Sequence, residues 1–247
     1  MSNKQMPIER SIPLANKVAN HLREQLRSKT SNDERLSGEL EIASELGVSR
    51  GTVRQALAIL EREGAIRRRQ GDGTYVNSQV LNIKTRAETA YEFTELIKSL
   101  GYKAEIVLIN AGHESASKDL AERLNVKPRA KLLVIRKLFF ADDKPAIYCT
   151  DMIPEELVCK PFEESELKKP VYDLLYQQCN LRVAHILAEF TPVVARGELT
   201  ELLKCQEGEP LALFEELNYS EDNKPVMFAR IYYREPLTRF TILRKKT

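Results

Sequence analysis

The sequence contains few of the residues that carry metal, disulfide or nucleophilic chemistry. Its three histidines and four cysteines are scattered, with no pair at the spacing of metal ligands. Secreted disulfide frameworks are small and rich in cysteine, so we expect reduced thiols here, and neither a metal nor another cofactor. No nucleophile stands beside a base and no phosphate-binding loop occurs, which argues against an enzyme. The cysteines are Cys149, Cys159, Cys179 and Cys205.

Long apolar runs and a strong charge of one sign are also missing. No stretch approaches the ~18 apolar residues that a membrane helix needs. The first ten residues are polar and lack the basic and apolar regions of a signal peptide. We therefore expect a cytoplasmic protein with no membrane partner. The net charge of +2, from 38 Lys and Arg against 36 Asp and Glu, says little about nucleic acid by itself.

The distribution of charge is more informative than the total. Residues 1–80 carry 13 Lys and Arg against 10 Asp and Glu, a net +3, which leaves −1 for the rest of the chain. Six arginines fall between Arg50 and Arg69. This local density favours a surface that binds nucleic acid.

The first 65 residues carry the apolar spacing of three helices. Leucine or valine recurs every four residues after Pro13, which predicts the first helix. A second helix is expected to start at a cap on Ser37 and to end at Gly47. A third is expected to start at a cap on Ser49 and to end at Gly64. The inward-facing positions of the third helix are Val53, Ala56, Leu57 and Leu60.

A basic hairpin is expected after the third helix. Two short alternating segments, 65–69 and 74–76, flank a turn with the sequence Gln-Gly-Asp-Gly. Helix, glycine turn, helix and hairpin in this order are typical of a winged helix-turn-helix, whose third helix enters the major groove of DNA. Arg50 and Arg54 are one turn apart, so both can reach the same groove. The alternative is a solvated helical face beside an ordinary hairpin.

The segment 36–76 resembles the DNA-binding domain of the GntR family of repressors. It reads LSGELEIASELGVSRGTVRQALAILEREGAIRRRQGDGTYV, against the family pattern LPSERELAExLGVSRxTVRxALxxLxxEGxIxxxxGxGTFV. The resemblance implies double-stranded DNA as a partner. The sequence departs from the pattern at two places: Ser37-Gly38 replaces Pro-Ser, and Leu40 stands where a DNA-contacting arginine is usual. We therefore expect either the affinity for the operator or the operator sequence to be unusual. The candidate DNA-binding residues are Ser49, Arg50, Gly51, Thr52, Arg54, Gln55, Arg69, Gln70 and Gly71.

The second part of the chain has a different pattern. We place the DNA-binding domain at residues 8–77, a polar linker at 78–88 and a mixed helix and strand domain at 89–247. Strands are predicted at 104–110, 131–140, 145–153, 183–190, 210–219 and 225–233. Helices are predicted at 91–100, 117–124, 170–178 and 196–203.

An internal repeat supports this division. Leu120, Leu124, Leu132 and Leu138 recur 79 residues later as Leu199, Leu203, Leu211 and Leu217. Lys144-Pro145 likewise corresponds to Lys224-Pro225 at a spacing of 80. The repeat predicts an α+β domain with one antiparallel sheet, helices on a face, and two pseudo-equivalent halves. The alternative is a chance similarity of two generic hairpins.

This part resembles the UTRA effector domain of the HutC subfamily. The segments that carry the resemblance are ADDKPAIYCTDMIP, PVYDLL and KPVMFARIYYR. The resemblance implies a chorismate-lyase-like fold, a small-molecule effector and a homodimer. The number of predicted strands argues against the other main effector domain of the family, which is all-helical and binds metal through histidines.

The resemblance also implies an effector site. In the phosphosugar sensors of the family, two arginines in an R-x-R strand and a serine hold the phosphate, and two acids hold hydroxyls. Lys137 and Phe139 occupy the arginine positions here, and Cys149 and Met227 the acid positions, so we expect a more apolar ligand. Arg136 is expected to pair with Glu215, Glu216 or the ligand, and several of these residues are equally compatible with a simple core. The candidate effector-binding residues are Arg136, Lys137, Phe139, Cys149, Tyr172, Met227 and Tyr233.

These observations predict a transcriptional regulator, in particular a homodimeric repressor that binds an inverted-repeat operator under the control of an effector. Two alternatives stay open. One is a constitutive DNA binder with a degenerate ligand domain, and the other is a DNA-binding protein with lyase-like activity.

Overall fold

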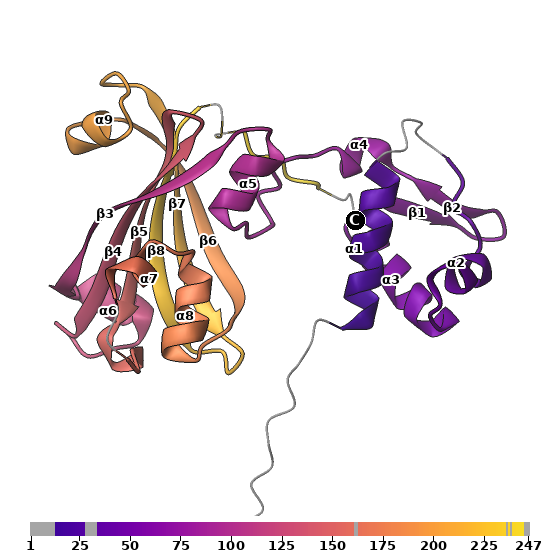
Figure 1. Cartoon of the computed structure of the whole chain (residues 1–247), viewed down its shortest axis with the longest axis horizontal. Coiled ribbons are helices and arrows are strands. Elements are labelled where there is room, and N and C mark those ends of the chain that lie inside the picture. The colour runs from indigo at the N-terminus through magenta and orange to yellow at the C-terminus, as the bar shows by residue number, and fades with distance from the viewer. Residues whose placement is uncertain (1–12, 28–33, 161–162, 236, 238, 245–247) are drawn as a thin grey trace, which may run out of the picture. The chain divides into compact units, whose positions relative to one another are not determined.

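The computed structural model describes residues 13–27, 34–160, 163–235, 237 and 239–244. It divides into two compact units (Figure 1). The first unit runs to Arg86 and also takes in the C-terminal residues from Ile242, whereas the second comprises Ala87–Thr241. No helix of the described chain is both long enough and apolar enough to cross a membrane.

The first unit has the predicted three helices and hairpin. Its elements are α1 Leu14–Arg27, α2 Glu39–Leu46, α3 Arg50–Arg62, β1 Ile66–Arg69, β2 Gly73–Val76 and α4 Ser78–Leu81. The apolar stripes of the three long helices meet in one core, in which Val53, Ala56 and Leu60 are fully buried. The predicted start of this domain at residue 8 lies outside the described residues.

Two boundaries of this unit differ from the sequence prediction. The N-cap of α2 is Gly38 rather than Ser37, and no side chain caps the helix. The predicted linker 78–88 begins with α4, whose Val80 and Leu81 are buried, because these apolar side chains pack within the first unit. The guanidinium of Arg86 donates to the carbonyl of Glu63 at 3.0 Å, so the predicted linker belongs to the first unit as far as Arg86.

The second unit contains one antiparallel sheet of six strands in the order β3-β4-β5-β8-β7-β6. The strands are β3 Ala104–Ser115, β4 Lys131–Ala141, β5 Lys144–Pro154, β6 Val183–Val194, β7 Pro210–Ser220 and β8 Pro225–Tyr233. The helices are α5 Phe93–Ser99, α6 Lys118–Leu124, η1 Glu155–Leu157, α7 Glu164–Leu167, α8 Val171–Cys179 and α9 Glu198–Leu202.

The strand order confirms the repeat that the leucine spacing predicts. One half runs β3, α6, β4, β5 and the other runs β6, α9, β7, β8. The halves join through the pairing of β5 with β8, where Cys149 lies opposite Ile231, so the order of the sheet reads symmetrically from either edge. This pairing gives each half a continuous sheet against which its helix can bury an apolar face.

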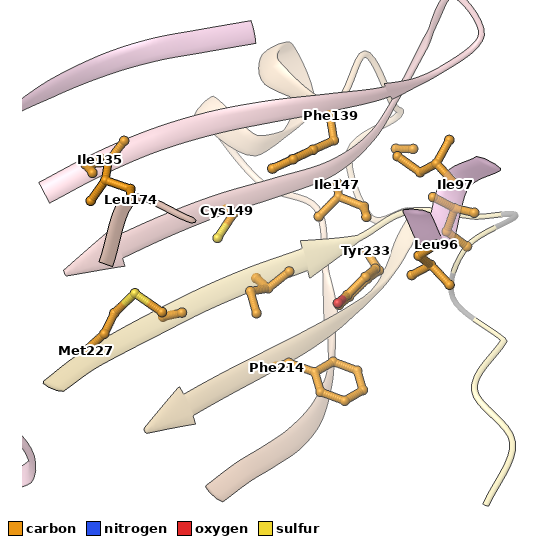
Figure 2. Close-up of a cluster of buried hydrophobic side chains, with 14 of the residues drawn as sticks. Leu96, Ile97, Ile135, Phe139, Ile147, Cys149, Leu174, Phe214, Met227 and Tyr233 are labelled. Atoms are coloured by element: carbon orange, nitrogen blue, oxygen red, sulfur yellow. The ribbon is translucent and has the colours of Figure 1, made fainter. Parts of the chain in front are cut away.

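Helices cover both faces of the sheet, not the single face predicted. Strand β4 is apolar on both faces because neighbouring side chains of a strand point to opposite sides. Leu133, Ile135 and Phe139 face the main core under α5, α7 and α8, part of which Figure 2 shows. Leu132 and Leu138 face the opposite side, where α6 and α9 pack in two smaller clusters.

Candidate DNA-binding surface and effector cavity

The start of α3 presents polar side chains to solvent. The hydroxyl of Ser49 accepts the backbone N–H of Thr52 at 3.1 Å, so Ser49 is the N-cap that the sequence predicts. Because the apolar positions of α3 point into the core, Arg50, Arg54 and Gln55 are exposed on the other side. Gly51 is also exposed, and the nearest described atom outside the helix backbone to a Cβ added there would be the Ser49 hydroxyl oxygen, at 3.7 Å. A DNA backbone can therefore approach this turn closely.

An acidic residue of α2 lies among these arginines. The carboxylate of Glu39 accepts from Arg50 Nε at 3.0 Å and from Arg54 Nη2 at 3.4 Å. Arg68 of β1 lies 4.0 Å from the same carboxylate. The hydrogen bond from Arg50 is the main cause that lowers the pKa of Glu39. Glu39 therefore orients the arginines and partly neutralises them, a role that the sequence pattern did not reveal.

The hairpin ends in a tight exposed turn. Arg69 pairs with Gly73 across the two strands, and Gln70 and Gly71 lie between them at the tip. Gly71 has φ of +76°, a conformation that favours glycine. The Arg69 guanidinium lies 3.6 Å from the Asp72 carboxylate and 4.6 Å from the centre of the Tyr75 ring. The predicted wing residues are thus grouped at one exposed turn.

Leu40 takes the position at which the family pattern has an arginine. Its side chain is 68% exposed on α2. The position therefore faces solvent, but it carries no charge with which to contact a phosphate.

In the second unit, a narrow, closely packed cavity lies between the sheet and the helices α5 and α8. Its walls combine aromatic and aliphatic side chains with a few ionisable groups. They are Tyr91, Glu92, Phe93, Lys137, Phe139, Asp151, Val171, Tyr172, Glu216, Met227, Ala229 and Ile231.

Four of the seven candidate effector-binding residues line this cavity, namely Lys137, Phe139, Tyr172 and Met227. Cys149 and Tyr233 are buried in the adjoining core, on the same side of the sheet as Phe139 and Met227 (Figure 2). Phe139 and Tyr233 both contact Phe93 edge to face, with ring centres 5.0 and 6.0 Å apart.

Arg136 does not reach the cavity, which corrects the sequence prediction. It is adjacent to Lys137 on β4, so its side chain points to the opposite face of the sheet. There its guanidinium donates to Glu114 at 2.7 Å and to Asn110 at 3.2 Å. The predicted pairing with Glu215 or Glu216 is therefore wrong, and Glu215 instead accepts from Arg230 at 2.7 Å.

The cavity holds two buried ionisable residues, of which the sequence predicted Lys137 but not Asp151. Lys137 is 1% exposed, and its ammonium donates to the carbonyl of Lys169 at 2.6 Å. Asp151 is 2% exposed and accepts from the thiol of Cys149 at 3.2 Å. Burial raises the pKa of Asp151, while the positive charge of Lys137 acts against that rise. The alternation of β5 could have revealed Asp151, since it lies two residues beyond Cys149 and so on the same face.

Glu216 is a cavity acid to which the described residues supply no counter-charge. Within the described part of the chain, its partly buried carboxylate makes no hydrogen bond or ion pair. Burial, followed by the charge of Asp151, raises its pKa to about 7. Tyr172 lies beside it, with its hydroxyl 3.4 Å from Asn218 Oδ1, and burial raises its pKa as well.

Glu216 and Tyr172 also line a wider outer groove. Its other walls are residues 87–90 and the start of the edge strand β6, from Val183 to Ala188. The two side chains therefore stand between the inner cavity and the groove, where an entering ligand would meet them. Among the described residues, no group of three or more His, Cys, Asp or Glu is arranged to hold a metal ion.

Comparison with known proteins covers both units. The profile described as "Bacterial regulatory proteins, gntR family" matches residues 14–76, and the UTRA domain profile matches residues 99–238. The HTH-type transcriptional repressor NagR of Bacillus subtilis is 29% identical over 233 residues, 94% of this chain and 93% of NagR. A probable fructoselysine utilization operon transcriptional repressor of Escherichia coli K12 is 26% identical over 209 residues, 84% of each chain.

A solved structure shows the same fold at low sequence identity. The possible transcriptional regulator YydK of Bacillus subtilis matches with a TM-score of 0.77 and 13% identity, over 94% of this chain and 99% of YydK. The two profiles match the chain in the same order as its two structural units, and together they show its family. It belongs to the GntR family of bacterial regulatory proteins, as a DNA-binding transcriptional regulator that carries a C-terminal UTRA domain.

Proposed function

We propose that this chain is a homodimeric repressor that acts on an inverted-repeat operator in the cytoplasm and is released by an effector in the inner cavity, without catalysing a reaction. The observation that carries the effector control is the presence of Lys137, Asp151 and Glu216, together with Glu92, in one cavity whose other walls are mainly aromatic and aliphatic. Burying charged groups costs free energy of folding unless they are paired. A ligand that supplies the missing charged or hydrogen-bonding partner would explain why these residues are kept in the cavity.

The DNA side of the proposal rests on the capped start of α3. Arg50 and Arg54 are exposed on one face, one helical turn apart, and the wing turn is also exposed. A two-fold dimer places two such helices on half-sites about one turn of DNA apart. The proposed contacts are Ser49, Arg50, Gly51, Thr52, Arg54, Gln55, Arg69, Gln70 and Gly71.

The charges of the cavity indicate the chemistry of the effector. Asp151 already opposes the positive charge of Lys137, and Glu216 has no cation of its own. An effector with a protonated amine, or with hydroxyls that donate to Glu216, would supply the missing partner. Phe139 and Met227 offer apolar contact to its carbon skeleton. The sequence predicts a mainly apolar ligand. From the charges of the cavity we instead propose a polar ligand that carries an amine.

One relative fits this chemistry. Fructoselysine, the compound in the name of the Escherichia coli relative, combines sugar hydroxyls with an amine. We propose the chemical class for this chain, not the compound.

The first experiment selects operators from sheared genomic DNA with the purified protein. Binding of wild type and Arg54→Ala to the recovered site is then compared at two salt concentrations, with Arg62→Ala as the control. Arg62 is exposed at the far end of α3, so its loss removes the same charge without touching the start of the helix. The proposal predicts an inverted repeat and a loss of about 1–3 kcal/mol for Arg54→Ala alone.

Effector control is tested on the same complex. Compounds that share a sugar ring but carry an ammonium, an acetamide or a phosphate are added to the protein–operator complex. Release by the ammonium compound supports the proposal. Equal operator binding with every compound would favour the constitutive DNA binder, since an effector must bind the two states with different affinities.

A further inference from the structure

We propose that Cys159 and Cys179 are a redox pair that closes to a disulfide when a peroxide oxidises the exposed thiol of Cys159. Cys159 follows η1 at the end of β5, and Cys179 is the last residue of α8. Both thiols are free in the structure. Neither residue belongs to the proposed DNA-binding surface or to the wall of the inner cavity.

Two contacts bring Cys159 to the last turn of α8. The backbone N–H of Cys159 donates to the carbonyl of Gln178 at 3.3 Å. The sulfur of Cys159 lies 3.9 Å from the carbonyl oxygen of Cys179. The two contacts place the Cys159 sulfur against the backbone of Cys179. A disulfide between two cysteines requires their Cα atoms to lie about 4.4–6.8 Å apart.

The two thiols differ in their accessibility to solvent, and this difference decides which of them reacts first with the oxidant. Cys159 is exposed and lines an open groove together with His113 and Lys160, so a small oxidant can reach its sulfur. Cys179 is 5% exposed in the main core, and burial raises its pKa to about 11. Cys159 is therefore the sulfur that meets the oxidant, and Cys179 is the one that resolves it.

The reaction takes one peroxide and two thiols. The Cys159 sulfur attacks a peroxide oxygen, so that an S–O bond forms, the O–O bond breaks and the leaving hydroxide takes the thiol proton as water. The Cys179 sulfur then attacks the Cys159 sulfur, the S–S bond forms and the S–O bond breaks. The Cys179 proton leaves with that oxygen as a second water. Two electrons pass to the peroxide, and a thiol reductant reverses the change.

Helix α8 links this pair to the effector cavity. Its first two residues, Val171 and Tyr172, line the cavity, and Cys179 lies at its other end, about 12 Å from Val171 at 1.5 Å per residue. Closing the disulfide fastens this end to the segment after β5. Oxidation therefore restrains one wall of the cavity without filling it.

The test uses the full chain, reduced, freed of reductant and exposed to hydrogen peroxide. Peptide mapping by mass spectrometry should find Cys159 joined to Cys179, with a loss of two hydrogens and full reversal by dithiothreitol. Cys159→Ser should abolish the link, and Cys205→Ser, which removes a thiol elsewhere in the unit, should leave it unchanged. Because the wild-type map alone identifies the link, a poorly folding Cys179 variant would not obscure the result.

The proposal is overturned if the folded wild-type chain accumulates sulfinic acid or an adduct at Cys159 while Cys179 stays a thiol. It is equally overturned if the disulfide forms only after unfolding in urea. Operator binding of the reduced protein does not enter either result, so this test is independent of the proposed function.

Discussion

The carboxylate of Glu39, at the start of α2, accepts a hydrogen bond of 3.0 Å from the guanidinium of Arg50, at the start of α3. The surface that is proposed to meet DNA phosphates thus contains a negative charge of its own. Arg54 shares the same carboxylate at 3.4 Å. Binding DNA requires the two arginines to exchange this partner for phosphates or bases.

Glu39→Gln is expected to strengthen binding to any DNA sequence and to reduce the preference for the operator. The change removes a negative charge and frees both arginines, which is worth roughly 1 kcal/mol, or about fivefold in affinity, at low salt. Fluorescence anisotropy with operator and scrambled duplexes measures both effects. Glu45→Gln, an equal change of charge at another exposed position of α2, is the control. Weaker binding of Glu39→Gln to both duplexes would contradict this interpretation.

Ser49→Ala is expected to destabilise the first unit by about 1 kcal/mol, because the side chain caps the first turn of α3. Urea unfolding followed by circular dichroism measures the loss. Ser44→Ala, within α2, removes a hydroxyl that has no capping role and should be close to neutral. If both variants unfold at the same urea concentration, the cap contributes nothing.

Glu216→Gln is expected to stabilise the protein at pH 8 but not at pH 4.5. The pKa of Glu216 is about 7 in the folded protein, against an ordinary value of 4.5. The folded state therefore keeps this proton while the unfolded chain loses it, so stability falls as pH rises from about 4.5 to 7. Removing the ionisable group should recover up to about 3 kcal/mol above pH 7.

The matched control is Glu215→Gln, one position away on the opposite face of β7. It loses the ion pair with Arg230 and should show no gain that grows with pH. Denaturant unfolding of both variants at the two pH values distinguishes the two acids. A gain for Glu216→Gln that is equal at both pH values would show that Glu216 does not titrate near neutral pH.

Lys137→Met is expected to destabilise the protein at neutral pH, by up to about 3–5 kcal/mol. It removes the positive charge that opposes the rise in the pKa of Asp151, so this buried carboxyl must either take up a proton or stay ionised without a counter-charge. Adding Asp151→Asn should recover much of this loss. A double-mutant cycle by thermal or urea unfolding gives the coupling. Additive losses from the two substitutions would mean that the two residues do not stabilise one another.

Strand alternation explains which effector residues could be predicted and which could not. Lys137 and Phe139 differ by two positions and share the face of the cavity, whereas Arg136 falls on the other face with Glu114. Choosing between neighbours such as Arg136 and Lys137 required knowing which face of β4 lies under α8. Both faces of this strand are apolar, so the sequence pattern alone did not distinguish them.

The sequence by itself determined the winged helix-turn-helix unit and the repeated order of helices and strands. The sequence features that predict the winged unit act between residues a few positions apart. They are the apolar spacing that directs Val53 and Leu60 inward, the cap at Ser49 and the glycine at the wing tip. The repeat was also visible, because the two halves carry the same spacing and therefore form the same elements.

Only the tertiary structure decided the charges of the cavity and the partners of the arginines. Asp151 and Glu216 lie on different strands, 65 positions apart, and meet because β8 pairs with both β5 and β7. Glu39 reaches Arg50 through the packing of α2 against α3. These contacts depend on which strands and helices become neighbours, and local periodicity does not encode that choice.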